Sequence, residues 1–151
     1  MVSLEKKAIL SLGLLLSLLL FSDCKKDDPQ PTEEERITKI LTSGQWLPAT
    51  GNWVTAGGTS VVELFTDFKI TFTETGYTTT GTTPVWPRTD TWSFKPGSTT
   101  VLIRSSDKIE VTIESIDERS LRLSLIWNQD TFVEGGRQSS IKGKHEFNLT
   151  R

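Results

Sequence analysis

The sequence predicts an all-β protein, in which an antiparallel up-and-down meander of about eight short strands closes into a small barrel behind one short N-terminal helix. Three observations predict this fold. Apolar and polar residues alternate through 108–128 on both sides of a polar turn, short apolar runs separated by glycine or proline turns continue from residue 46 onward, and 33–44 has helical periodicity. A two-sheet sandwich has the same strand pattern, but closure into a barrel is favoured because it leaves no sheet edge exposed.

The helix is predicted to begin directly after Thr32. The stretch 32–35 reads Thr-Glu-Glu-Glu, which is the spacing of a capping box, in which the first and last side chains each accept a hydrogen bond from the other's backbone amide. A narrow apolar stripe follows, and Gly44 marks the end of the helix. The stripe consists of Ile37, Ile40 and Leu41. We expect this helix to plug one end of the β structure.

The strongest strand signal is the hairpin 108–128, because both of its halves alternate with period two. One face is apolar and must be covered, whereas the other can stay in water. The apolar face consists of Ile109, Val111 and Ile113 on the first strand and Leu121, Leu123, Leu125 and Trp127 on the second.

The remaining strands are shorter. They are predicted within 46–54, at 69–72 and 77–80, at 92–94 and 101–104, and near 144–150. Residues 61–67 fit either a single helical turn, with Leu64 and Phe65 packed inward, or one more strand. The residues 81–88 and those that follow Trp127 are predicted to be loops, because they contain Pro84 and Pro87 or a double glycine.

Residues 1–23 are predicted to be a lipoprotein signal peptide. Lys6 and Lys7 precede an apolar run, 8–21, that is too short to span a membrane comfortably. The run ends in Leu19-Leu20-Phe21-Ser22-Asp23-Cys24, which resembles the lipobox of bacterial lipoproteins. This resemblance implies cleavage before Cys24 and attachment of lipid to Cys24, so that the membrane is a partner through that lipid. An uncleaved helical anchor is the alternative.

Residues 24–32 are then the lipidated cysteine and a disordered tether, since they are charged, contain proline and have no apolar residue to bury. The domain 33–151 is expected to hang from the outer membrane of a cell envelope. Bacteroidetes lipoproteins look similar after their cysteine, and an acidic stretch there implies transport to the cell surface. Asp27 and Asp28 fit that signal, and a solvated linker on the periplasmic face is the alternative.

The composition excludes several classes of function. A formal net charge of -2 provides no basic field, so no nucleic-acid partner is predicted. With one cysteine and one histidine, we predict no catalytic residues, no metal site and no cofactor, and therefore no enzyme. Glu110 and Glu114 lie on the wet face of the hairpin, and a glycosidase pair would need two carboxylates across a cleft. His145 shares the parity of Phe147, so it either gives an interior pocket one polar anchor or is hydrogen-bonded near the end of the last strand.

Several short motifs carry a family resemblance. After the helix come Gly44-x-Trp46, Thr71-Phe72-x-x-x-Gly76-Tyr77, Thr91-Trp92-Ser93-Phe94, Ile113-x-x-Ile116 and Leu121-x-Leu123. Together they resemble the lipocalin-like domains of Bacteroidetes lipoproteins over residues 33–151. This resemblance implies a calycin-type barrel with an internal cavity for an apolar ligand, and it supplies neither a settled ligand nor a catalytic set.

Two functions follow from these expectations. In the first, the barrel binds a small hydrophobic ligand in a cavity lined by Trp46, Phe72, Trp92, Phe94, Ile113, Leu123, Trp127 and Phe147. In the second, side chains fill the barrel, and the loops 82–88 and 130–140 contact a polysaccharide or another envelope protein. Trp86 is the ring expected at the surface, because Pro87 stiffens the loop that presents it.

Overall fold

The computed structural model describes residues 29–132, 135–136 and 138–151, and the compact unit within it runs from Pro31 to Arg151. The predicted signal peptide, Cys24 and most of the predicted tether lie outside the described residues. The first elements are α2 (Glu33–Leu41), β1 (Gln45–Pro48), β2 (Val54–Ala56), β3 (Thr59–Ser60), the 3-10 helix η1 (Val62–Leu64), β4 (Lys69–Phe72) and β5 (Gly76–Thr80). They are followed by β6 (Thr89–Phe94), β7 (Val101–Arg104), β8 (Glu110–Ile116), β9 (Ser120–Trp127), β10 (Thr131–Phe132), β11 (Gln138–Ser140) and β12 (Gly143–Thr150).

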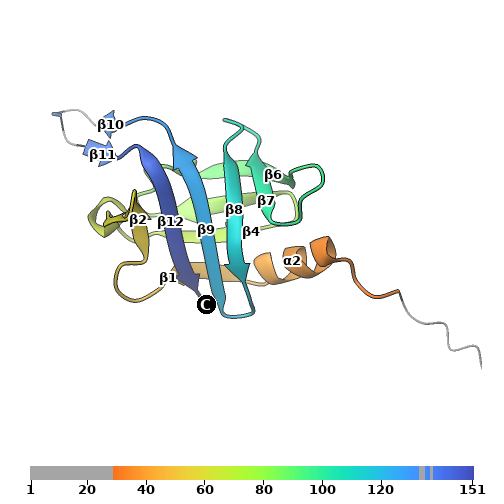
Figure 1. The fold of residues 1–151 in the computed structure, drawn as a ribbon. Helices are drawn as coiled ribbons and strands as arrows, with labels where there is room; N and C mark the ends of the chain where they lie inside the picture. The colour runs from red at the N-terminus through yellow and green to blue at the C-terminus, as the bar shows by residue number, and fades with distance from the viewer. Residues whose placement is uncertain (1–28, 133–134, 137) are drawn as a thin grey trace, which may run out of the picture. The chain divides into compact units, whose positions relative to one another are not determined.

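Eight antiparallel strands form a closed barrel. Their order is β1-β4-β5-β6-β7-β8-β9-β12, and the pairing of β1 with β12 closes the ring through Leu47 opposite Thr150 and Pro48 opposite Leu149. The long strands β9 and β12 lie side by side along eight residue pairs (Figure 1). The predicted all-β, calycin-type barrel with a short N-terminal helix is therefore confirmed.

The hairpin of β8 and β9 keeps its apolar face inward by means of a bulge. Val111 and Ile113 lie opposite Leu125 and Leu123, and Ile116 lies opposite Leu121. Ile116 follows Ile113 by three positions, and in an uninterrupted strand this odd spacing would turn Ile116 outward. The register shift between Ile113 and Ser115 absorbs the extra residue and returns Ile116 to the partly buried face.

The two ends of the barrel differ. Because the strands alternate in direction, α2, the turns 73–75, 95–100 and 117–119, and Arg151 belong to one end, which we call the helix end. Residues 49–68, 81–88, 105–109 and 128–142 belong to the other, the loop end. The hairpin β10–β11 extends beyond β9 and β12 there (Figure 1), so the predicted loop after Trp127 contains two short strands.

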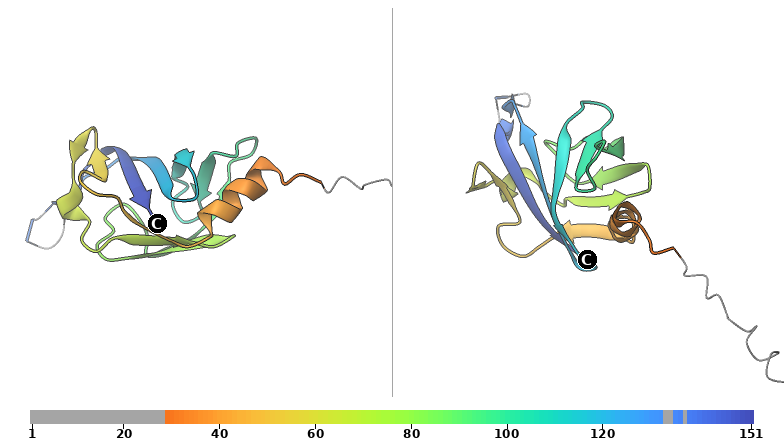
Figure 2. Two further views of the ribbon diagram at one scale, coloured as in Figure 1. Left: turned by 90° about the horizontal axis from the view of Figure 1, so that it is seen from below. Right: turned by 45° about the vertical axis from the view of Figure 1, so that its right-hand side comes forward.

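At the helix end, α2 leads into β1 (Figure 2), and of its apolar stripe Ile37 and Leu41 are buried and Ile40 is partly buried. The predicted capping box is present, with the Glu35 amide donating to Thr32 Oγ1 at 3.2 Å and the Thr32 amide to Glu35 Oε2 at 2.7 Å. Trp46 Nε1 donates to the Leu41 carbonyl at 2.9 Å, which joins the helix to the first strand. The guanidinium carbon of Arg151 lies 4.3 Å from the centre of the Trp46 ring, so this stacked pair covers the helix end.

At the loop end, residues 61–67 form the helical turn rather than a strand. The 3-10 helix Val62–Leu64 places Phe65 in the core, with Leu64 partly buried. Phe65 and the nearby Phe68 contact each other and Trp53 at ring-centre distances of 5.3–5.9 Å. The result is an aromatic layer that lies across this end of the barrel.

Candidate functional site: a buried polar cluster at the loop end

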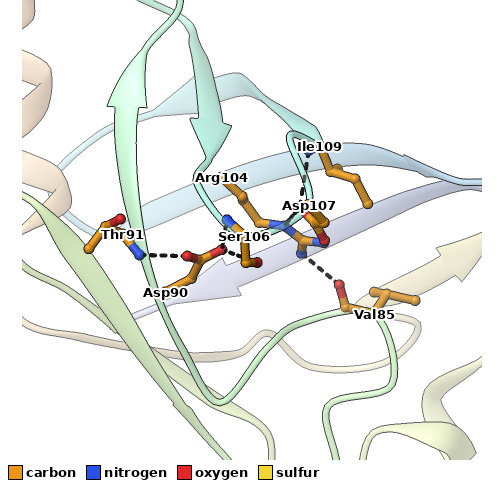
Figure 3. A network of polar contacts seen from close by, with 7 residues as sticks. All are labelled: Val85, Asp90, Thr91, Arg104, Ser106, Asp107 and Ile109. Carbon is orange, nitrogen blue, oxygen red and sulfur yellow. Dashed lines mark hydrogen bonds and ion pairs between the residues drawn. The ribbon is translucent and has the colours of Figure 1, made fainter.

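A buried arginine is the most unusual side chain of the barrel. Arg104 ends β7 and is 1% exposed, because it has the inward parity of Leu102 two residues before it. Its Nε donates to Asp107 Oδ1 at 3.1 Å, its Nη2 forms an ion pair with Asp107 Oδ2, and its Nη1 donates to the Val85 carbonyl at 2.7 Å (Figure 3). The charge is thus paired in the two-point geometry that binds a carboxylate most firmly.

The turn after β7 holds Asp107 in place. Lys108 has a positive φ of 61°, and the Ile109 amide donates to Asp107 Oδ1 at 3.1 Å. Partial burial works to raise the pKa of Asp107, but the hydrogen bonds from Arg104 and from the Ile109 amide outweigh it, and the pKa lies below its ordinary value. The carboxylate is therefore charged at neutral pH and balances Arg104.

A second carboxylate fixes the same turn from β6. Asp90 accepts from the Ser106 hydroxyl at 2.6 Å, from the Ser106 amide at 3.2 Å and from the Thr91 amide at 2.8 Å (Figure 3). In the register of β5 and β6 it lies opposite Tyr77. Asp90 therefore ties β6 to the turn between β7 and β8, beside Arg104.

The aromatic side chains of Tyr77 and Trp86 lie beside Arg104 and Asp107. We call these four residues the polar cluster. The rings of Tyr77 and Trp86 meet edge to face at 5.4 Å, and the Arg104 guanidinium carbon lies 5.4 Å from the centre of the Trp86 ring. Each ring is 3% exposed. Within the described structure, neither Tyr77 Oη nor Trp86 Nε1 has a hydrogen bond of good geometry, although Arg104 lies close enough to Tyr77 to oppose the effect of burial on its pKa. Burial raises the pKa of Tyr77, so its hydroxyl is neutral.

His145 lies inside the barrel near the polar cluster, as its parity with Phe147 predicted. It is fully buried, and its Nδ1 lies 3.3 Å from the Gly143 carbonyl. Since a carbonyl only accepts, this contact places the proton on Nδ1 and leaves Nε2 as an acceptor, which has no partner in the described residues. Burial lowers the pKa of His145 against the opposing effect of the Gly143 carbonyl, so the ring is neutral.

Aromatic rings connect these groups to one another. Phe147 contacts His145 at 6.2 Å, Trp86 at 5.6 Å and Phe65 at 5.6 Å, and Tyr77 contacts Phe72 at 5.8 Å. The barrel interior around Trp86 is therefore apolar and aromatic, and three of its polar atoms have no hydrogen-bond partner among the described residues, namely Tyr77 Oη, Trp86 Nε1 and His145 Nε2.

The residues predicted to line a cavity lie mostly in the core. Trp46, Phe72, Trp92, Ile113, Leu123 and Phe147 are buried, and Phe94 and Trp127 are partly buried. The structure brings Phe72 and Phe147 to the polar cluster. Trp46 packs near the helix end, and Trp92 Nε1 donates to the carbonyls of Thr73 and Gly76 there.

The expectation that Trp86 is presented at the surface is wrong. Its ring turns inward over the loop end, because the Val85 carbonyl before it accepts from Arg104 and the Pro87 carbonyl after it accepts from the Thr79 hydroxyl at 3.0 Å. The proline-stiffened loop thus directs the ring into the barrel rather than out of it.

Hollows of the described surface lie around α2 instead. One of about 630 Å³ is lined by α2 and by the turn that follows β8, with Ile40 and Ile116 among charged residues that include Arg36, Asp117 and Arg151. These hollows are open, and the polar cluster does not line them.

No family model matches the chain, and comparison with curated proteins and with solved structures gives no significant match. Within the described part of the chain, no helix has the length and apolar character that crossing a membrane requires. Nor do three His, Cys, Asp or Glu side chains of the described residues gather as a metal ion would need. The functional conclusion therefore rests on the geometry of the barrel interior.

Proposed function

We propose that this protein is a lipid-anchored, non-enzymatic binding protein of a bacterial cell envelope, whose lipocalin-like barrel binds a small, largely apolar molecule at the loop end. The observation that carries the proposal is the pair of unpartnered polar atoms, Tyr77 Oη and Trp86 Nε1, in an aromatic interior. Leaving a buried donor or acceptor unpaired costs about 1–3 kcal/mol. A side chain that served only to fill space would not need these atoms, whereas a ligand with a polar group would satisfy them.

A second function is favoured by a different observation. The ring contacts from Trp53 through Phe68, Phe147, Trp86 and Tyr77 are continuous at 5.3–6.1 Å, as in a barrel filled by its own side chains. The protein would then act as an anchored interaction module that contacts a polysaccharide or another envelope protein through its loops.

Native mass spectrometry separates the two functions. The protein 25–151 contains α2, every strand that the structure describes and the whole compact unit from Pro31 to Arg151. We expect a small molecule to copurify with it, to dissociate on mild activation and to change the tryptophan fluorescence as it leaves. An unliganded mass, with no fluorescence response to long-chain alcohols, acids or sterols, would exclude the ligand-binding function and favour the filled barrel.

The anchor is tested separately with the full-length chain. Metabolic labelling with an alkyne analogue of palmitate should label the wild-type protein and leave Cys24→Ser unlabelled. A wild-type protein that takes up no label and keeps the mass of residues 1–23 would instead support the uncleaved helical anchor.

A further inference from the structure

We infer that the bound molecule presents a neutral oxygen, as a hydroxyl or a carbonyl, to Tyr77 and Trp86, and that these two side chains select it over a charged head group. This inference rests on the proposed function and specifies the chemistry of its ligand.

The two unpartnered atoms set the first condition. Trp86 Nε1 only donates, so whatever meets it must accept a hydrogen bond. Tyr77 Oη both donates and accepts. An ammonium group has three donors and no acceptor, so it cannot satisfy Trp86 Nε1. A hydroxyl or carbonyl oxygen satisfies both atoms.

The charges around the polar cluster set the second condition. Arg104 is the cation beside Trp86, and its Nε, Nη1 and Nη2 already donate to Asp107 and to the Val85 carbonyl. Asp90 adds a second carboxylate opposite Tyr77. Arg104, Asp107 and Asp90 together carry a net charge of one negative. A ligand carboxylate would therefore lose its water next to two other carboxylates, with an arginine that is already paired as the sole cation among them.

Trp86 is also the reporter of binding. It lies on the 81–88 loop, whereas Tyr77, Arg104 and His145 lie on barrel strands. The loop is fastened to its surroundings by hydrogen bonds that include Arg104 Nη1 to the Val85 carbonyl and the Thr82 amide to the Thr66 carbonyl at 2.7 Å. An oxygen that accepts from Trp86 Nε1 alters the surroundings of this ring, so binding should change the tryptophan fluorescence.

Three probes with the same alkyl chain test the inference on the protein 25–151. Decanol, decanoate and decylammonium are titrated at neutral pH below their micelle concentrations, and binding is followed by tryptophan fluorescence and calorimetry. We expect decanol to bind at least about tenfold more tightly than either ion. Tightest binding by an ion would overturn the inference and leave the binding function standing. No binding by any probe, together with an unliganded mass, would overturn both.

Two substitutions show which atoms hold the oxygen. Tyr77→Phe and Trp86→Phe each remove one unpartnered polar atom and keep an aromatic ring. Each should weaken decanol binding about five- to tenfold. Tyr77→Phe should change the urea midpoint of the unliganded protein little, whereas Trp86→Phe should lower it, because the smaller ring leaves space beside Tyr77 and Phe147 and loses the contact with Arg104.

Ser124→Ala is the matched control. Ser124 is buried on the outward side of β9, and its hydroxyl donates to Glu114 Oε1 at 2.6 Å. Its removal should lower the urea midpoint and leave decanol affinity unchanged. If Tyr77→Phe and Trp86→Phe leave decanol affinity unchanged, as Ser124→Ala does, those two polar atoms do not meet the ligand, and the inference is wrong.

Discussion

Breaking the buried ion pair of Arg104 should destabilise the protein far more than breaking a similar pair at its surface. Asp107→Asn keeps the shape of the side chain and an acceptor for the Ile109 amide, but it removes the charge and turns an amide toward the guanidinium. Loss of one partner from a fully buried pair costs about 3–5 kcal/mol. Asp107 is 33% exposed, so water reaches the pair, and we expect a loss of about 2–3 kcal/mol in the free energy of unfolding.

The surface pair of Arg36 and Glu33 provides a close control. It also joins an arginine to an acid three residues away, with Nε to Oε2 at 2.8 Å and Nη2 to Oε1 at 2.6 Å, but its side chains are 47% and 53% exposed. Glu33→Gln should therefore change the urea midpoint very little. Urea unfolding followed by tryptophan fluorescence measures both variants. Equal losses would refute the reasoning that burial determines the strength of the Arg104 pair.

The same experiment has a pH dependence with a definite sign. The pKa of Asp107 is lowered in the folded protein. The charged carboxylate therefore contributes fully to the free energy of unfolding above the ordinary aspartate pKa of about 3.9, and this contribution is lost as the pH falls through the lower pKa of the folded state. The difference in the free energy of unfolding between the wild type and Asp107→Asn should therefore become smaller below about pH 4. A difference that stayed constant down to pH 2 would show that charge is not its cause.

Three further outcomes are expected from urea unfolding. Gly81 has φ of 77°, and a Cβ there would lie 2.3 Å from the Thr66 carbonyl oxygen, so Gly81→Ala should lower the free energy of unfolding by at least about 3 kcal/mol. Gly97 has a similar φ of 78° but open space around it, so Gly97→Ala should lower it by only about 1 kcal/mol. Similar losses in the two variants would contradict the clash at Gly81. Thr32→Ala should cost about 1 kcal/mol through loss of the cap, and no change would mean that α2 adds little to stability. Burial lowers the pKa of His145, so below about pH 6.5 the unfolded chain binds a proton at this residue that the folded protein does not. The free energy of unfolding of the wild type should therefore fall, relative to that of His145→Gln, by up to about 1.4 kcal/mol per pH unit. Equal pH dependence of the two proteins would refute this.

Local patterns in the sequence were sufficient to predict most of the fold. The capping box at Thr32 and the alternation of 108–128 depend on neighbouring residues, and both the helix and the hairpin occur as predicted. The number of strands could be predicted from the spacing of the turns. Closure of the barrel could be predicted because it leaves no strand with an unpaired backbone edge. Residues 61–67 were ambiguous, because a few apolar residues next to a threonine or serine fit a turn and a strand equally well, and tertiary packing of Phe65 decided between them.

The candidate site was harder to predict. Arginine is rarely buried, so its position favoured an exposed strand end, and only the shared parity of Leu102 and Arg104 pointed inward. The three-residue spacing to Asp107 was visible in the sequence, but an arginine and an aspartate at that spacing are common on surfaces. Trp86 was predicted outward because a loop sequence does not reveal which way its side chains turn, and the contact between Arg104 and the Val85 carbonyl is long-range.

The pairing of β1 with β12 also bears on how the chain folds. Leu47 meets Thr150 across the closing seam, and β12 is in addition the neighbour of β9 and β2. The ring cannot close until residue 150 has left the ribosome, and during that time β1, β2 and β9 each have an edge with unpaired backbone groups. Contacts so distant in the chain are slow to form, typically over milliseconds to seconds. A nascent chain of this protein therefore stays open along one seam until β12 has been made, and during that time its open edges expose it to aggregation.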